Sequence, residues 1–199
     1  MVLVKLLPRY CQHQALPIGW RRSITKNTLP RTQMAMTAIH QLELIIRWPH
    51  LANMNEITPI NSKGEAYEVK IDESELKKRV DPLSFNVLRK ADTEMAFTGE
   101  YTDTETVGVY KCKACAAELF RSETKFHSGC GWPSFYAPTE KDAVELIEDR
   151  SLFPRIRTEV RCAACGSHLG HVFSGEGYAV PTDERWCINS VALVLEAKA

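Results

Sequence analysis

Six of the seven cysteines in this chain follow a pattern that separates metal binding from thiol chemistry. Four of them form two C-x-x-C pairs, which are Cys112/Cys115 and Cys162/Cys165. Two such pairs offer four thiolates, the ligand set of a structural tetrahedral zinc site. Cys130 and Cys187 stand outside the pairs and are not needed for the tetrahedron. The pattern therefore predicts one metal site and two thiols with chemical roles.

Each pair lies in a sequence that predicts a metal-binding turn. YKCKACAAELF and VRCAACGSHLG both place a strand end before the first cysteine and a turn between the two cysteines. In this arrangement, a zinc knuckle, two sulfurs point at one ion, and two knuckles complete the tetrahedron. We expect one structural Zn2+, because four protein ligands leave no open position for water or substrate. The alternatives are unpaired core thiols or a redox-active C-x-x-C.

The segment RWCINS, residues 185–190, predicts a reactive strand around Cys187. Side chains alternate between the two faces of a strand, so Arg185, Cys187 and Asn189 would share one face. A cation beside a thiol favours the ionised form, and the thiolate is the nucleophile. The alternative is a small core cysteine beside a surface arginine, which is the commoner environment of a lone strand cysteine.

Two histidines favour the catalytic interpretation. His168 and His171 in SHLGHVF would point to opposite faces of a regular strand, so both can reach one site only if Gly170 bends the chain. Each could instead be a hydrogen-bonded structural imidazole. A histidine pair close to a metal knuckle, with a separate thiol downstream, fits Cys/His chemistry better.

A segment rich in glycine and proline, HSGCGWPSF, carries Cys130 and Trp132. Such a sequence predicts a loop rather than a regular helix or strand. An indole in this loop is either a core plug or the wall of an apolar pocket.

The elements that must position these residues are predicted to be two helices followed by short strands. Asp72 followed by Glu75 resembles a capping box, and Asp81 next to Pro82 is typical of a helix start. The second helix would have an apolar face made of four residues, which are Leu83, Phe85, Val87 and Leu88. Six β-type runs follow, at residues 107–112, 116–120, 143–148, 155–162, 168–173 and 186–196.

The order of these elements predicts the fold class. The run 143–148 is also compatible with a helical turn, but the others are strand-like. We therefore expect a mainly β fold of small antiparallel sheets, β-tent-like, with an N-terminal helical hairpin and the structural zinc site.

Composition narrows the range of partners. The chain has 199 residues, of which 44% are hydrophobic, so it can bury one ordinary core. Residues 1–42 carry six basic residues and no acidic ones, so the rest has 19 basic against 25 acidic residues, a net charge of −6. A mildly acidic body argues against nucleic acid as a partner. No stretch approaches the roughly 18 apolar residues of a membrane span, so no membrane partner is expected.

The N-terminal arm shows no sustained periodicity. We expect residues 1–55 to be a disordered leader or presequence and residues 56–199 to be a single domain. Residues 1–42 of the arm lack acidic residues and carry Arg, Ser and Thr, as organellar presequences do, but a protein that starts at a later methionine would look the same. We favour a dispensable leader on a cytoplasmic protein, with an organellar location as the alternative. We expect a monomer.

Four motifs together resemble those of the B-type methionine sulfoxide reductases, the methionine-R-sulfoxide reductases. They are KCKAC, FHSGCGWPSFY, RCAACGSHLGHVF and RWCINS; they occur in the family's order, and the match runs from about residue 76 to residue 195. The resemblance implies that Cys187 is the nucleophile, that Cys130 is the resolving thiol, and that the four paired cysteines bind zinc.

The resemblance also implies roles for the residues around the thiols. His168, His171 and Asn189 are similar to the family's sulfoxide-binding and proton-handling residues. Trp132 resembles the wall of its methyl pocket, and Arg185 resembles the residue that assists the thiolate. The implied substrate is methionine-R-sulfoxide, free or in proteins, and the implied reductant is thioredoxin.

Two positions depart from the family pattern. Trp186 stands where tyrosine is usual, but strand alternation points it away from the reactive face, so we expect a packing change. His127 stands where aspartate is usual, and we expect it to alter local pKa values or loop order.

Two other functions remain compatible with the sequence. In a non-catalytic zinc-knuckle interaction module, Cys130 and Cys187 would be buried and inert. In a redox switch that releases zinc, oxidation would occur at Cys112 and its partners before Cys187.

Overall fold

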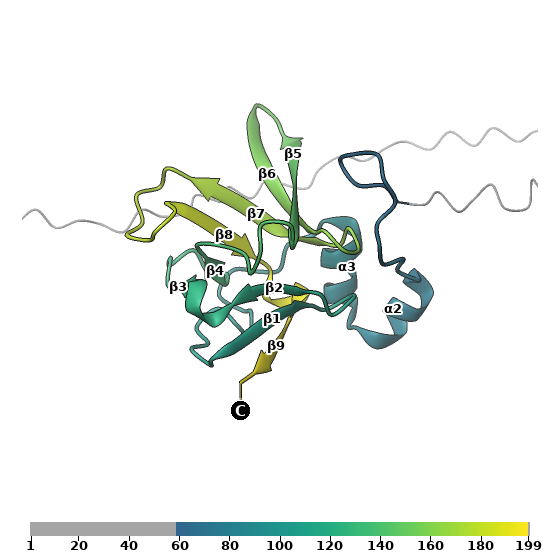
Figure 1. The fold of residues 1–199 in the computed structure, drawn as a ribbon, viewed down its shortest axis with the longest axis horizontal. Helices are drawn as coiled ribbons and strands as arrows, with labels where there is room; N and C mark the ends of the chain where they lie inside the picture. The colour runs from purple at the N-terminus through teal and green to yellow at the C-terminus, as the bar shows by residue number, and fades with distance from the viewer. Residues whose placement is uncertain (1–58, 199) are drawn as a thin grey trace, which may run out of the picture. The chain divides into compact units, whose positions relative to one another are not determined.

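The computed structural model describes residues 59–198, which form two antiparallel β-sheets with two helices beside them (Figure 1). The predicted leader, residues 1–55, lies outside the described residues. Within the described part of the chain, no helix is long and apolar enough to cross a membrane. The protein is mainly β with a helical preface, so the predicted fold class is confirmed.

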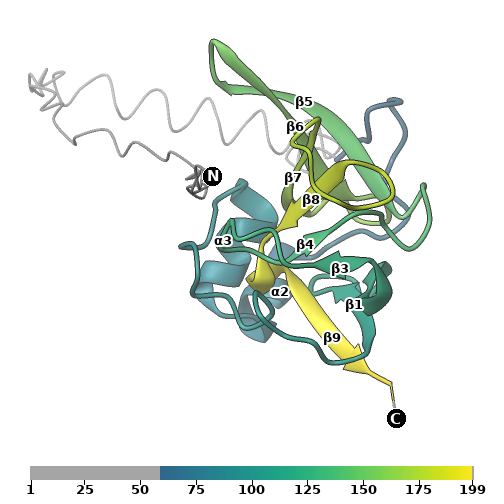
Figure 2. The same ribbon diagram turned by 90° about the vertical axis from the view of Figure 1, so that its left-hand side faces the viewer.

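The larger sheet has six strands in the order β3-β4-β8-β7-β6-β5. Its strands are β3 (Lys125–Phe126), β4 (Ser134–Phe135), β5 (Val144–Leu152), β6 (Arg155–Cys162), β7 (His168–Ser174) and β8 (Glu184–Ile188). The predicted run 143–148 is therefore part of a strand and not a helical turn. Figures 1 and 2 show β5 and β6 extending as a hairpin beyond the rest of the sheet.

The smaller sheet has three strands in the order β2-β1-β9. They are β1 (Gly108–Cys112), β2 (Glu118–Arg121) and β9 (Leu193–Ala197). The predicted run 186–196 is thus wrong as a single strand, because it divides into β8 and β9 in different sheets. The 3-10 turn η3 (Ser190–Ala192) joins them, and the carboxylate of Glu94 accepts hydrogen bonds from two backbone N–H groups of this turn. A carboxylate from a distant loop therefore fixes the turn, and strand periodicity cannot reveal it.

Both helices begin where the sequence predicts. Helix α2 (Glu73–Arg79) is N-capped by Asp72, whose carboxylate accepts hydrogen bonds from two backbone N–H groups of the first turn. Helix α3 (Pro82–Lys90) is N-capped by Asp81. Hydrogen bonds from the hydroxyl and the backbone N–H of Ser84 lower the pKa of Asp81 to about 2. These caps satisfy helical donors that have no partner within the helix.

Helix α3 packs against β7 and η3, behind the sheet that carries the reactive residues. Phe85, Val87 and Leu88 are buried, and each contributes about 1.5–3 kcal/mol to stability. Leu83 is 42% exposed, so the predicted apolar face is wrong at this position. The buried stripe of α3 also includes Ser84 and follows the helical period, which leaves Leu83 at its margin.

An aromatic cluster fills the core between the two sheets. The ring of Phe135 on β4 stacks on Phe120 with centroids 4.5 Å apart and meets Tyr110 edge-on at 5.0 Å. Trp186 is paired with Phe135 across β4 and β8, and its ring centroid lies 6.2 Å from that of Phe120. Trp186 is therefore buried on the core side, which confirms that it points away from the reactive face.

A β-bulge brings the two predicted histidines to one face. The register of β6 and β7 shifts by one residue at Arg161, which pairs with His168. Leu169 is the extra residue on β7, and it shifts the alternation so that His168 and His171 share a face. The expected convergence is confirmed, but its cause is the bulge at Leu169 and not a bend at Gly170.

The absence of a side chain at Gly170 allows β7 and β8 to approach closely. A Cβ atom at this position would overlap the backbone carbonyl oxygen of Cys187. We predict that Gly170→Ala lowers the free energy of unfolding, measured in urea, by about 3 kcal/mol, since rigid backbone blocks the space. Gly64→Ala is the comparator. Gly64 has a φ of +80° but nothing lies within 4 Å of the added Cβ atom, so we expect the free energy of unfolding to fall by only about 1 kcal/mol. Equal losses in the two variants would contradict the close-approach explanation.

Candidate functional site

One face of the six-stranded sheet carries a row of polar side chains centred on Cys187. The register pairs Cys187 with Ser134 on β4 and with His171 on β7. His171 is in turn paired with Glu159 on β6. Directly paired residues of antiparallel strands share a face, so these four side chains lie side by side.

Cys130 and Cys187 meet at this face although they are 57 residues apart in the sequence. Cys187 lies on β8, and Cys130 lies on the loop before β4. Their Sγ atoms are 3.6 Å apart, compared with about 2.05 Å in a disulfide. The loop reaches this position through Gly129 and Gly131, whose φ angles of 73° and 94° are left-handed. The structure therefore brings together the two thiols that the cysteine pattern sets apart from the metal.

The surroundings of Cys130 favour its thiolate. The hydroxyl of Ser128 donates to its Sγ at 3.1 Å, and the hydroxyl of Ser134 lies 3.5 Å away. The contact with Cys187 and these hydroxyls outweigh the effect of burial and lower the pKa of Cys130 to about 4. Contact with the Cys187 sulfur is the largest of the effects that lower this pKa, so the two sulfurs are coupled.

Arg185 supplies the predicted cation near the thiols. Its side chain is 4% exposed, and it donates two hydrogen bonds to Glu176, at 2.7 and 3.0 Å. Burial lowers its pKa, but Glu176 and the sulfurs of Cys187 and Cys130 raise it above the ordinary value. The ring of Phe173 lies 4.5 Å below the guanidinium. No sequence motif marks Glu176, because its pairing with Arg185 depends on the turn between β7 and β8.

Both histidines are held by carboxylates. Nδ1 of His168 lies 2.6 Å from Glu159, and Nε2 of His171 lies 2.9 Å from Asp149. The two imidazole centroids are 5.6 Å apart and meet edge to face. Burial lowers the pKa of His171 below its ordinary value, although Asp149 opposes this effect. Asp149 and Glu159 come from the β5–β6 hairpin, where no motif identified them.

A buried carboxylate residue, Glu94, connects the two remaining predicted residues. Nε1 of Trp132 donates to the backbone oxygen of Glu94 at 3.1 Å, and the backbone N–H of Glu94 donates to Oδ1 of Asn189 at 3.0 Å. Nδ2 of Asn189 donates to the backbone oxygen of Leu169 at 3.0 Å. Asn189 lies just past the end of β8, and its side chain joins the β-bulge at Leu169 to the loop that carries Glu94. Contact of Trp132 or Asn189 with a substrate stays a prediction.

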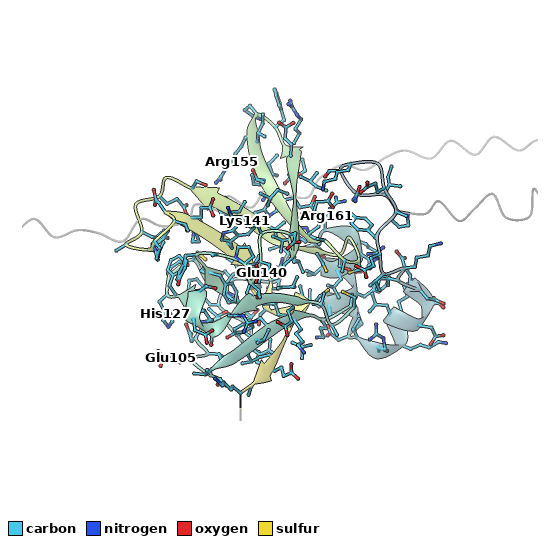
Figure 3. The ribbon with its side chains drawn as sticks, viewed as in Figure 1. Glu105, His127, Glu140, Lys141, Arg155 and Arg161 are labelled. Carbon is cyan, nitrogen blue, oxygen red and sulfur yellow. The ribbon has the colours of Figure 1, made fainter. Side chains whose placement is uncertain are left out.

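His127 lies on the surface next to β3, where Figure 3 labels it. Its side chain is 60% exposed, and its Nδ1 is 3.6 Å from Asp103. An influence of His127 on local pKa values or loop order stays a prediction.

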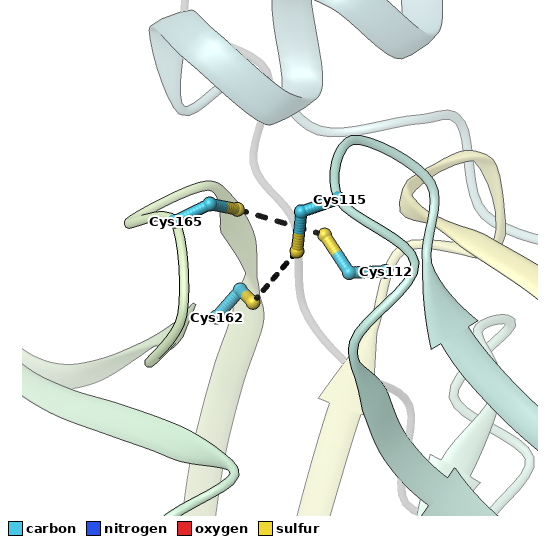
Figure 4. A group of neighbouring side chains, drawn as sticks. All are labelled: Cys112, Cys115, Cys162 and Cys165. Carbon is cyan, nitrogen blue, oxygen red and sulfur yellow. Dashed lines mark hydrogen bonds between the residues drawn. The ribbon is translucent and has the colours of Figure 1, made fainter. Parts of the chain in front are cut away.

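The four paired cysteines converge on one point between two facing turns (Figure 4). Their sulfurs lie within 4.8 Å of one another; Cys112 and Cys165 are separated by 3.8 Å, and Cys115 and Cys162 by 3.6 Å. A tetrahedron with metal–sulfur bonds of about 2.3 Å has edges of about 3.8 Å. The sulfurs therefore fit a tetrahedral metal ion.

The two turns share one backbone conformation. The N–H of Ala116 donates to the oxygen of Cys112 at 2.7 Å, and the N–H of Gly166 donates to the oxygen of Cys162 at 2.8 Å. Ala116 and Gly166 both have a left-handed φ, of 64° and 69°. Since Cys112 ends β1 and Cys162 ends β6, the cluster joins the small sheet to the large one.

Known proteins match most of the described region. The family model of the SelR domain matches residues 80–197, which is more than half of the chain. A protein of Leifsonia xyli subsp. xyli named peptide methionine sulfoxide reductase MsrB is 54% identical over 131 residues, covering 66% of this chain and 92% of the relative. Proteins of the same name from Burkholderia vietnamiensis and Burkholderia ambifaria are each 48% identical over 138 residues, covering 69% of this chain and 95% of each relative.

We predict that Cys130 reacts as a thiolate with the small reagent methyl methanethiosulfonate at neutral pH. A lowered pKa means that the thiolate is present above that pKa and is lost as the pH falls through it, so the rate stays nearly constant between about pH 8 and pH 6. Cys187→Ala removes the main cause and raises the Cys130 pKa toward about 8.5, so its rate falls over this range. Peptide mass spectrometry at Cys130 measures both rates, and identical pH profiles would contradict the coupling of the two sulfurs.

Proposed function

Because this chain belongs to the SelR family of B-type methionine sulfoxide reductases, we propose that it reduces the R epimer of methionine sulfoxide through Cys187. The chain is an enzyme of this family, and its substrate is methionine sulfoxide. The 3.6 Å separation between the sulfurs of Cys187 and Cys130, with the Arg185 cation on the same face, supports a reaction through Cys187.

In the first step, the Cys187 thiolate attacks the sulfur of methionine sulfoxide. The substrate oxygen takes up a proton as its bond to the methionine sulfur breaks, and a neighbouring imidazole, His168 or His171, supplies it directly or through water. The protonated oxygen transfers to the Cys187 sulfur as the bond between the two sulfurs breaks, so methionine leaves as the thioether and Cys187 becomes a sulfenic acid. The partial exposure of Cys187 and the buried cation of Arg185 support this assignment.

In the second step, Cys130 attacks the sulfenic sulfur of Cys187 and expels water. The two sulfurs need to approach by only about 1.5 Å to reach disulfide distance. An external dithiol then reduces the disulfide by thiol exchange, and we propose thioredoxin for this role.

Substrate binding uses the indole of Trp132 as an apolar wall for the methyl group. The hydrogen bond from Trp132 to the backbone of Glu94 supports this role, since it fixes the ring beside the thiol loop. Selection of the R epimer requires that the sulfoxide oxygen is also held, and we assign this to Asn189 and to His171 once Nδ1 has taken up a proton. An amide has two N–H donors, so Asn189 keeps one for substrate while it bonds Leu169.

The four paired cysteines hold Zn2+ in this proposal, because a tetrahedron of four thiolates is the ligand set of structural zinc. The role is structural, since the cluster joins β1 to β6 and leaves no open coordination position. A domain start near residue 56, a cytoplasmic location and a monomeric state complete the proposal.

Substitution of each thiol separates their roles. We predict that Cys187→Ser abolishes release of methionine from methionine-R-sulfoxide, because a serine hydroxyl cannot replace the thiolate. Cys130→Ser is expected to release about one methionine per protein and then stall in a thioredoxin-coupled assay, because no disulfide can form. Repeated turnover by Cys130→Ser with thioredoxin would refute the resolving role.

A single reaction distinguishes the proposal from the two alternatives. After treatment with methionine-R-sulfoxide, we expect free methionine, one retained zinc ion per chain and a Cys130/Cys187 disulfide, measured by chromatography, metal analysis and peptide mass spectrometry. Absence of methionine release would favour an interaction module. Zinc loss with oxidation at Cys112 before Cys187 would favour a redox switch.

A further inference from the structure

Two carboxylates that no motif identified lie against the two histidines. We infer that Asp149 and Glu159 are positioning residues that hold the imidazoles in opposite tautomers, and that Asp149 leaves Nδ1 of His171 as a proton acceptor. Through this Nδ1 atom, a proton of the Cys130/Cys187 thiol pair can pass to the sulfoxide oxygen. The inference rests on the proposed function for its consequence in catalysis.

Asp149 is an ionised acceptor for His171. Its Oδ2 lies 2.9 Å from Nε2 of His171 and 3.0 Å from Nε of Arg157, the residue paired with it across β5 and β6. Burial raises the pKa of Asp149, but hydrogen bonds from Ser151, His171 and Arg157 lower it well below the ordinary value. A carboxylate without a proton can only accept, so Nε2 of His171 carries the hydrogen between them.

The other nitrogen of His171 is then without a proton. Burial lowers the pKa of this imidazole, so at neutral pH it is uncharged and carries one hydrogen. Because the hydrogen is on Nε2, Nδ1 has a lone pair. His171 is directly paired with Cys187 across β7 and β8, so this acceptor belongs to the side chain next to the reactive sulfur.

Glu159 fixes the opposite tautomer at His168. Its Oε1 lies 2.6 Å from Nδ1 of His168, and Arg161 donates to both of its oxygens, at 3.0 and 2.9 Å. Burial raises the pKa of Glu159, but His168 and Arg161 outweigh it and lower the pKa to about 2. Nδ1 of His168 therefore carries a hydrogen. Separate carboxylates hold the two rings edge to face. A histidine with a purely structural role does not need such a pair of fixed rings.

The competing explanation is that Asp149 only stabilises the hairpin through its ion pair with Arg157. Exposed ion pairs contribute little, about 0–1 kcal/mol, but this pair is mostly buried, so a structural role has to be separated by experiment. Arg157→Gln removes the ion pair and keeps the carboxylate on His171. Glu148→Gln changes the neighbouring residue of β5, whose exposed side chain points to the other face.

The test uses Asp149→Asn in the full chain with 15N-labelled histidine. In the wild type we expect the hydrogen of His171 on Nε2 by NMR. In Asp149→Asn this single tautomer is lost, and kcat for methionine-R-sulfoxide falls about 100-fold with little change in KM. Asp149→Glu should restore part of kcat, while Arg157→Gln and Glu148→Gln should keep the tautomer and kcat within a few-fold.

Three outcomes would overturn the inference: a wild-type His171 with its hydrogen on Nδ1, an Asp149→Asn variant that keeps both tautomer and kcat, or an equal loss of kcat in Arg157→Gln. Urea unfolding of each variant shows whether a lost NMR signal reflects a lost fold. If Asp149→Asn does not fold, the tautomer and kcat of Asp149→Glu and Arg157→Gln test the inference instead. A wild-type protein that does not release methionine would refute the proposed function, whereas the NMR measurement would still decide the tautomer.

Discussion

The position of β8 between β4 and β7 is the constraint on which the site depends. It places Cys187 next to Ser134 and the Cys130 loop on one side and next to His171 on the other. The pairing with β7 is possible only because Gly170 has no side chain to meet the backbone of Cys187. The strand order thus places the Cys130 loop on one side of Cys187 and His171 on the other.

Four carboxylates hold the parts of this site in place. Glu94 accepts from the turn after β8, Glu176 pairs with Arg185, and Asp149 and Glu159 hold the two histidines. A buried polar group without a partner costs about 1–3 kcal/mol, so each of these contacts is a condition for burying the group it meets. The cysteine cluster has a separate task, since it joins the ends of β1 and β6 and leaves the reactive pair outside its coordination.

Local features of the fold were predictable from the sequence. Asp72 and Asp81 cap their helices because the acceptor and the donors are two or three residues apart. Trp186 faces the core because alternation along a strand depends only on its neighbours. The predictions were wrong where distant residues decide: Glu94 helps divide the run 186–196 into two strands, and packing of α3 leaves Leu83 at the margin of its buried stripe.

The sequence by itself determined the spacing of the cysteines, the helix starts, the mainly β class and the motifs shared with a family. These depend on residue type and on separations of a few positions. Only the tertiary structure decided which groups touch: Cys130 and Cys187 are 57 positions apart, and His171 and Asp149 are 22 apart. Such contacts depend on strand order, register and one extra residue at Leu169, and no local pattern encodes them, because each strand takes its neighbours from the whole sheet.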